Sequence, residues 1–292
     1  MITIDKSFAK THLPYRPHNA HKGTMGTLLA VCGSYGMAGA VTLCTTAALK
    51  SGLGLLKTAL PKSIYPICAG NLPESVYLPL EETKNGTISA FNSEKILETA
   101  NASSAVVIGC GLGCDYDTAK IVADLLQNCK VPLIIDADGI NCIARFIDLD
   151  ILSKADCDVI LTPHPGEMGR LYGATPEYIN SNREAVATSF ASKHNVTVVL
   201  KGHDTLVASP DGRCAINTTG NAGMATGGSG DVLAGVISSL SSQGSCAFDA
   251  ACTGVYIHGL AGDIASEMYG QISMLPTDLI NCLHKAFSRV KI

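Results

Sequence analysis

The chain has little of what nucleic-acid surfaces and membrane spans require. Only 16% of its 292 residues are charged, the net charge is −4, and lysine and arginine are scattered along the chain. A basic field that would attract nucleic acid is therefore missing, and we expect no nucleic-acid partner. The apolar runs are as long as strands and fall short of the ~18 residues that a membrane helix needs. We expect no membrane partner either.

Aromatic residues are also scarce, because the chain contains no tryptophan and only six phenylalanines. Hydrophobic residues nevertheless reach 47%, and 29 glycines accompany them. This composition favours an aliphatic, tightly packed α/β core. Residues 1–23 contain no continuous apolar segment of the kind found in secretory signals, so we expect a cytoplasmic protein.

The twelve cysteines form no regular framework of spacings. Several lie inside apolar runs, as do Cys32, Cys44, Cys110 and Cys252. Cys110 is followed closely by Cys114, but no second cysteine or histidine pair would complete a metal site there. We expect buried free thiols in a reducing compartment, in preference to disulfides, a metal site or a redox role.

Strand and helix patterns alternate along the chain. The predicted buried strands are 27–33, 53–60, 103–109, 131–137, 157–162 and 196–202. The predicted helices are 39–52, 116–128, 177–194, 230–242, 247–268 and 277–289. Near-continuous Val, Ile and Leu in the strands indicates an α/β fold, with a mostly parallel central sheet covered by helices on both faces.

Residues 205–217 differ, because Asp211-Gly212 separates two short apolar runs and predicts a late antiparallel hairpin. The chain shows no linker, low-complexity tract or internal repeat. We therefore expect a single domain over residues 1–292.

The glycine-rich stretch "GNAGMATGGSGDVLAG" (220–235) leads into an apolar helix pattern. A loop of this kind leaves backbone N–H groups free at the positive end of a helix, where an anion can bind. Asp231 stands beside that place, which suits a base that takes a proton from a hydroxyl during phosphoryl transfer. The simpler interpretation is that the glycines cap a helix and that Asp231 complements its dipole. The full string favours the catalytic interpretation.

Two further loops follow predicted strands. In "GCGLG" (109–113), Gly111 and Gly113 permit close approach of the backbone to a ligand at the carboxyl end of a strand, although a plain tight turn is the alternative. In "ILTPHPGEMGRL" (160–171), prolines fix His164 for ligand contact. Glu167 could orient Mg²⁺ or its waters, or could simply be a charge at a helix N-terminus.

Three more segments have the same form of a strand followed by a polar or glycine-rich turn. "VVLKGHDTLV" (198–207) places Lys201 where it could hold a nucleotide, or begin an ordinary turn. "CGSYGMAGAVTL" (32–43) brings the small side chain of Ala40 to the start of a helix. In "IIDADGIN" (134–141), Asp136 and Asp138 could orient the site or cap the next helix.

These strings, together with "HKGTMG", occur in the order seen in the ADP-dependent NAD(P)H-hydrate dehydratases, which the chain resembles from about His21 to Leu283. The resemblance implies a ribokinase-like fold and a repair reaction, in which the 6S hydrate of NADH or NADPH is phosphorylated by ADP and loses phosphate, leaving AMP. No epimerase-like domain precedes the matching region, so the chain resembles the stand-alone bacterial form.

The resemblance also implies roles for individual residues. Catalysis would rest on Asp231 as the base, with Gly228, Ser229 and Gly230 as the anion hole. The hydrate would contact Ala40, Gly111, Gly113, His164 and Asp231. The adenine nucleotide would bind at Lys201, Gly202, His203, Asp204, Thr205 and Gly230. Mg²⁺ would bridge the phosphates, with Glu167 as its candidate residue, and the family's homo-oligomers imply a homotetramer.

The sequence departs from the family pattern at two positions, where Ala222 and Ser229 replace the usual proline and threonine. Ser229 keeps the hydroxyl, and Ala222 leaves the N–H donors in place. Two other functions remain open. One is a small-alcohol kinase of the same superfamily, of the hydroxymethylpyrimidine or hydroxyethylthiazole type. The other is a nucleotide-binding regulator without catalysis.

Overall fold

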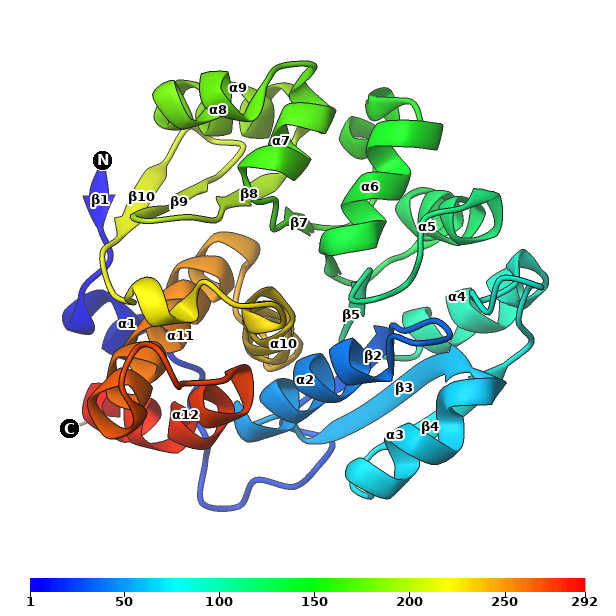
Figure 1. Ribbon diagram of the computed structural model, residues 1–292, viewed down its shortest axis with the longest axis horizontal. Helices are drawn as coiled ribbons and strands as arrows, with labels where there is room; N and C mark the ends of the chain where they lie inside the picture. The colour runs from blue at the N-terminus through cyan, green and yellow to red at the C-terminus, as the bar shows by residue number, and fades with distance from the viewer. Residues whose placement is uncertain (292) are drawn as a thin grey trace.

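A single ten-stranded sheet runs through the molecule in the order β1-β10-β9-β8-β7-β6-β5-β2-β3-β4 (Figure 1). The computed structural model describes residues 1–291. The strands are β1 (Ile2–Thr3), β2 (Thr27–Val31), β3 (Leu55–Pro61), β4 (Val76–Leu80), β5 (Ala105–Ile108), β6 (Leu133–Ile135), β7 (Val159–Leu161), β8 (Thr197–Leu200), β9 (Thr205–Ala208) and β10 (Cys214–Asn217). Only β9 runs antiparallel to its neighbours, β8 and β10.

Helices cover both faces of this sheet. The first face carries α4 (Ser93–Asn101), α5 (Tyr116–Asn128), α6 (Ala137–Phe146), α7 (Pro165–Tyr172), α8 (Pro176–Ser181) and α9 (Arg183–His194). The second carries α2 (Ala38–Lys50), α3 (Tyr65–Asn71), α10 (Ser229–Ser242) and α11 (Ala247–Tyr269), with α1 (Lys6–His12) and α12 (Pro276–Lys291) packed on the outside. The predicted α/β class with two covered faces is confirmed.

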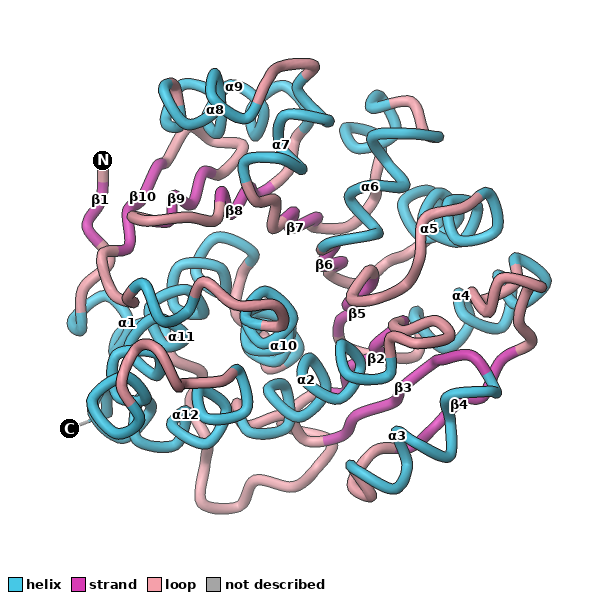
Figure 2. The backbone as a smooth tube through the Cα atoms, in the orientation of Figure 1, coloured by secondary structure: helices cyan, strands magenta, loops and turns pink. Residues whose placement is uncertain are grey.

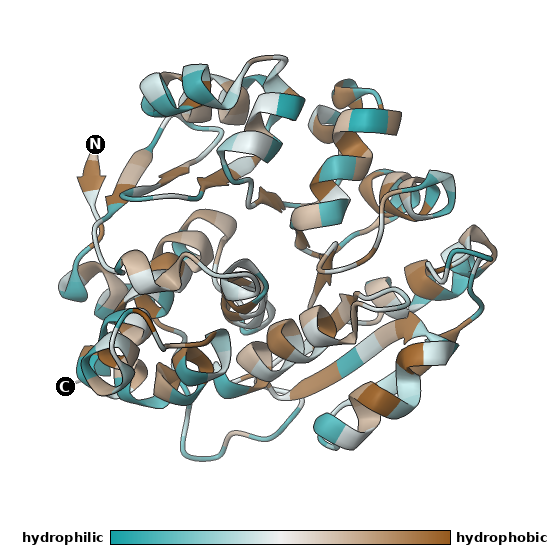
Figure 3. Cartoon of the chain, in the orientation of Figure 1, coloured by the Kyte–Doolittle hydropathy of each residue, from teal (hydrophilic) through white to brown (hydrophobic). Residues whose placement is uncertain are grey.

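The strands form because their residues are buried on both sides. Along β5, for example, Val106 and Ile108 pack into the core of the first face, whereas Ala105 and Val107 pack into that of the second. All four are fully buried, as expected of a parallel strand between two helical layers. Figure 3 shows the hydrophobic colour concentrated in the strands and on the helix faces turned toward them.

The predicted hairpin is confirmed as β9 and β10, which pair in antiparallel register around Asp211-Gly212. The predicted helix over 177–194 is wrong in one respect, because it is two helices that break at Asn182. The amide of Asn182 donates to the Tyr178 carbonyl at 2.9 Å, and such local side-chain bonds compete with helix continuation. Several elements have no counterpart among the predicted ranges: α1, α3, α4, α6, α7, β1 and β4.

β4 escaped prediction because Pro79 lies inside it. A proline cannot donate to a strand ladder, which argues against a central strand. The sheet order places β4 at an edge, where one side of the strand has no ladder to complete.

All twelve cysteines are free, and most are buried, as expected. Among residues 1–291, no helix has both the length and the apolar character needed to cross a bilayer.

α10 and α2 lie side by side against the middle of the sheet (Figure 2). Their backbones approach so closely that a Cβ added at Gly235 of α10 would lie 2.1 Å from the Cys44 carbonyl oxygen of α2. Gly235 therefore sets how near α10 comes to α2. The N-termini of both helices lie at the carboxyl edge of the parallel strands, so this contact also positions the candidate site.

We expect Gly235→Ala to lower the free energy of unfolding by about 3 kcal/mol, because the new methyl group must push two helix backbones apart. Gly39→Ala is the matched control, since a Cβ there meets nothing within 4 Å. Gly39 lies in the first turn of α2, where alanine should be neutral or stabilise by up to about 1 kcal/mol. Urea unfolding of both variants measures the difference, and equal stabilities would contradict the close-packing account.

Candidate active site

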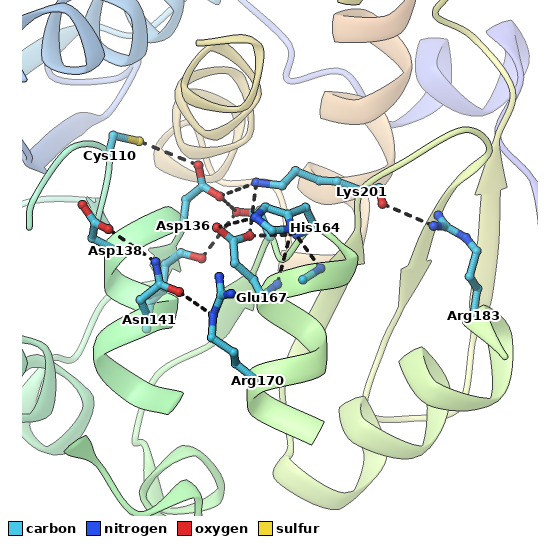
Figure 4. A network of polar contacts seen from close by, with 12 residues as sticks. Cys110, Asp136, Asp138, Asn141, His164, Glu167, Arg170, Arg183 and Lys201 are labelled. Atoms are coloured by element: carbon cyan, nitrogen blue, oxygen red, sulfur yellow. Dashed lines mark hydrogen bonds and ion pairs between the residues drawn. The ribbon is translucent and has the colours of Figure 1, made fainter. Parts of the chain in front are cut away.

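The candidate residues gather at the carboxyl ends of five neighbouring parallel strands, β8, β7, β6, β5 and β2. The segments that follow these strands lie at one edge of the sheet, where open α/β folds bind ligands. The N-terminus of α10 reaches the same edge from the second face. Segments far apart in the sequence therefore meet in one place (Figure 4).

A buried ion pair joins the ends of β8 and β6. Lys201 Nζ lies 2.7 Å from Asp136 Oδ1, to which the Thr162 hydroxyl also donates at 2.7 Å. The Asp136 residue is only 1% exposed. Burial by itself would lower the pKa of the Lys201 ammonium, but Asp136 and Glu167 raise that pKa above its usual value. Lys201 therefore remains a cation at the centre of the site.

The N-terminus of α10 points toward this ion pair. A Cβ added at Gly230 would lie 3.4 Å from Lys201 Nζ and 3.9 Å from Asp136 Oδ2. Gly228 precedes the helix with a φ of 101°, in the left-handed region that glycine tolerates. The buried Ser229 hydroxyl has no hydrogen-bond partner among residues 1–291. The Ser229 N–H already donates to the Thr226 carbonyl at 3.4 Å, but the helix N-terminus, the unpaired hydroxyl and the nearby ammonium together suit a phosphoryl group.

Asp231 follows directly, in the first turn of α10. Burial, reinforced by the negative charge of Asp136, raises the pKa of Asp231 to about 7. The Cys110 sulfur lies 3.9 Å from Asp136 Oδ2 and within 4.8 Å of a carboxylate oxygen of Asp231. An acid with this pKa can accept and release a proton near neutral pH, which general base catalysis requires.

His164 and Glu167 form a capping box at the start of α7. His164 Nδ1 accepts from the Gly166 and Glu167 N–H groups, and Glu167 Oε2 accepts from the His164 N–H at 2.8 Å. Burial lowers the pKa of His164 and raises that of Glu167 to about 7. Glu167 is thus a carboxylate at the N-terminus of a helix, which is one of the two roles that the sequence suggested for it. It also lies 3.7 Å from Lys201 Nζ, inside the site.

Ala40, Gly111 and Gly113 lie together on the β2 and β5 side of the site. A Cβ added at Gly111 would lie 2.9 Å from that of Ala40, so the two backbones are in close contact. The Gly113 N–H donates to Asp138 Oδ2 at 2.8 Å. Asp138 therefore orients a site loop. The Asp136 carboxylate makes no capping bond to α6 and binds Lys201 instead. Asp136 therefore orients the site rather than the helix.

The segment 201–205 is held from behind by a residue that the sequence analysis did not single out. The Arg183 guanidinium donates to the carbonyls of Leu200, Lys201 and Asp204. His203 is exposed at the surface, whereas the Thr205 hydroxyl turns back to the Gly202 carbonyl. Arg183 begins a helix in the sequence, and nothing in that local pattern signals its role.

His258 was missed for the same reason. It lies in the middle of α11, and its Nε2 is 2.9 Å from the Ser229 carbonyl oxygen. Burial lowers the pKa of His258 to about 4. The imidazole is therefore neutral and donates to this carbonyl, which fixes the first turn of α10.

We expect Lys201→Met to lower the free energy of unfolding by about 3–5 kcal/mol, because it leaves the Asp136 carboxylate buried without its cation. Lys130→Met is the control, since Lys130 and Asp156 pair with both side chains exposed and their loss should change little. Adding Asp136→Asn to Lys201→Met should recover part of the loss. Urea unfolding that gave equal effects for the two lysines would contradict the buried pair.

The comparisons with known proteins agree with one another. The family model described as NAD(P)H-hydrate dehydratase matches residues 28–285. The chain is 43% identical, over 96% of its length, to the bifunctional NAD(P)H-hydrate repair enzyme Nnr of Thermofilum pendens, of which it covers 53%. It thus spans about half the length of the bifunctional relatives that it matches. It is 38% identical, over 87% of its length, to the ADP-dependent (S)-NAD(P)H-hydrate dehydratase of Neisseria meningitidis, of which it covers 82%.

The fold agrees as well. The crystal structure of the ADP/ATP-dependent NAD(P)H-hydrate dehydratase from Bacillus subtilis, co-crystallised with ATP and Mg²⁺, superposes with a TM-score of 0.85 at 30% identity. The match covers 99% of this chain and 98% of the other. The predicted ribokinase-like fold is therefore confirmed. The family model and the two sequence relatives place the chain, by its residues as well as its fold, in the NAD(P)H-hydrate dehydratase family.

Proposed function

We propose that this chain restores NADH and NADPH from their 6S hydrates at the expense of ADP, giving AMP and phosphate. The observation that carries the proposal is the position of Asp231 in the first turn of α10, beside N–H groups and the unpaired Ser229 hydroxyl. The Neisseria meningitidis relative, named an ADP-dependent (S)-NAD(P)H-hydrate dehydratase, supports the same reaction.

In this proposal, Asp231 accepts the proton of the ring hydroxyl while that oxygen takes the phosphoryl group from ADP, and AMP leaves. The phosphorylated ring then expels phosphate and loses a proton from the neighbouring carbon, which restores the double bond. A carboxylate with a pKa of about 7 suits the first step, because a base works best when its pKa is near the ambient pH.

The surrounding groups would stabilise the charge that moves in this reaction. The Gly228 to Gly230 backbone and the Lys201 ammonium face the place where the transferring phosphoryl group would lie. The hydrate would bind on the β2 and β5 side, at Ala40, Gly111, Gly113 and His164. The adenine nucleotide would bind on the β8 side, at Lys201, Gly202, His203, Asp204, Thr205 and Gly230.

A magnesium ion fits the donor set that Glu167 offers. One Glu167 oxygen accepts from the His164 N–H, and the carboxylate faces the same centre as Lys201. Mg²⁺ usually keeps several waters and needs few protein carboxylates, so Glu167 can serve it through a water ligand. When bound, Mg²⁺ would offset the charge of the nucleotide phosphates. We also propose a single-domain, cytoplasmic homotetramer.

The direct test is recovery of the near-ultraviolet absorbance of NADH from purified NADH hydrate, with Mg²⁺ and with ADP, ATP or no nucleotide. We expect recovery with ADP, in an amount that matches the AMP and phosphate formed. No recovery from a folded protein with either nucleotide would overturn the proposal. Phosphorylation of hydroxymethylpyrimidine or hydroxyethylthiazole would then favour the small-alcohol kinase, and nucleotide binding without any turnover would favour the regulator.

We expect Asp231→Ala and Asp231→Asn to lower turnover by about 10²–10⁴-fold while nucleotide binding stays largely intact, because each removes the proton acceptor.

The wild-type rate should rise with pH through about 7, as Asp231 loses its proton while facing Asp136, Lys201 and Cys110. The residual rate of Asp231→Asn should lack that step. Glu184→Gln, which changes an exposed first-turn acid of α9, is the control. An equal loss of ADP binding in the Asp231 variants would mean that Asp231 holds the nucleotide instead.

A further inference from the structure

Three thiols from three separate elements meet beneath the candidate site. Cys32 follows β2, Cys44 lies in α2 and Cys110 follows β5. Their sulfur atoms all lie within 4.8 Å of one another, and all three residues are completely buried. We call this group the thiol trio. Buried free thiols were expected here, in preference to a metal site or a redox role.

The arrangement approaches the geometry of a metal-thiolate site. Zinc–sulfur bonds of about 2.3 Å in a tetrahedral site place the sulfurs about 3.8 Å apart. The thiol trio would have to contract by no more than about 1 Å to reach that spacing.

A carboxylate reaches one member of the thiol trio, Cys110, and would have to shift toward Cys32 and Cys44 to complete a tetrahedral site. The Cys110 sulfur, one carboxylate oxygen of Asp136 and one of Asp231 all lie within 4.8 Å of one another. Asp136 is already held by Lys201 and Thr162. Asp231 makes no ion pair among the described residues 1–291, so its carboxylate is the oxygen ligand that remains available.

We propose that Cys32, Cys44 and Cys110 bind one thiophilic d¹⁰ cation, Zn²⁺ or its chemical equivalent Cd²⁺, with Asp231 as the fourth ligand. Each thiol that coordinates releases its proton to solvent, and no electron is transferred. The bound cation withdraws Asp231 from proton transfer and stops turnover. This consequence, but not the binding itself, rests on the proposed function.

Access and charge are both compatible with such a site. The thiol trio is closed to solvent, whereas Asp231 is partly exposed, so the cation enters from the Asp231 side. Three thiolates and one carboxylate around a divalent cation leave excess negative charge. The Lys201 ammonium and the positive N-terminus of α10 lie nearby and offset that charge.

Cadmium titration of the full chain, kept reduced with a phosphine, tests the site directly through the thiolate-to-cadmium charge-transfer absorbance. We expect one tight Cd²⁺ per chain, displaced by Zn²⁺. Cys44→Ala, and Cys44→Ser with a more similar volume, should bind Cd²⁺ at least about 100-fold more weakly, because each removes a ligand. Cys44 is the residue to change because, unlike Cys110, it does not belong to the group of potential ligands that contains Asp136 and Asp231.

Two controls account for the other thiols. Cys157→Ala removes a partner of the neighbouring thiol Cys129, and Cys246→Ala removes the exposed cysteine. Both variants should retain the tight site. The same tight Cd²⁺ binding in folded Cys44→Ala or Cys44→Ser, or no tight binding by the reduced wild type, would overturn the proposal.

Activity gives the second readout. Zn²⁺ at one equivalent should inhibit the wild type at least about tenfold, a chelator should reverse the inhibition, and Cys44→Ala should keep near-wild-type activity and resist it. If the chain shows no dehydratase activity, the cadmium spectrum still reports the site. If turnover proceeds while the tight site is filled, the inhibitory role is wrong and the proposed function stands.

Discussion

The buried ion pair between Lys201 and Asp136 is the contact around which the site is arranged. Two charges taken out of water are costly unless their remaining bonds are satisfied. Here Asp136 also accepts from Thr162, and Glu167 lies 3.7 Å from the ammonium. These groups come from β6, β7, β8 and α7, so satisfying one pair fixes the relative positions of four elements.

The same pair divides the work between two aspartates. Asp136 meets a cation and holds it in place, whereas Asp231 lies close to Asp136, is partly buried and has no cation of its own among the described residues. Burial and the neighbouring charge therefore raise the pKa of Asp231 to about 7. One carboxylate is structural and the other can exchange protons, and the difference comes from their surroundings alone.

The close contact of α10 with α2 connects this chemistry to the core. Gly235 lets α10 lie against α2, and the N-terminus of α10 then reaches the carboxyl edge of the sheet. The same contact brings Cys44 beside Cys32 and Cys110, and Cys110 in turn lies within 4.8 Å of an Asp231 carboxylate oxygen. His258 in α11 fixes the first turn of α10 through the Ser229 carbonyl. α10 is thus held by contacts with both α2 and α11.

The sequence by itself determined the strands of the sheet's middle, the late hairpin and the loops at which the site forms. These features depend on local periodicity and on turn residues, as with Val106 and Ile108 in β5 or Asp211-Gly212 between β9 and β10. Local pattern did not separate α8 from α9 at Asn182, and Pro79 concealed the edge strand β4. Only the tertiary structure decided that Asp136 pairs with Lys201, 65 residues away, that Arg183 and His258 support the site, and that three cysteines meet. Such contacts join residues that are far apart in the chain, so they depend on strand order and helix packing and leave no signal in the local sequence pattern.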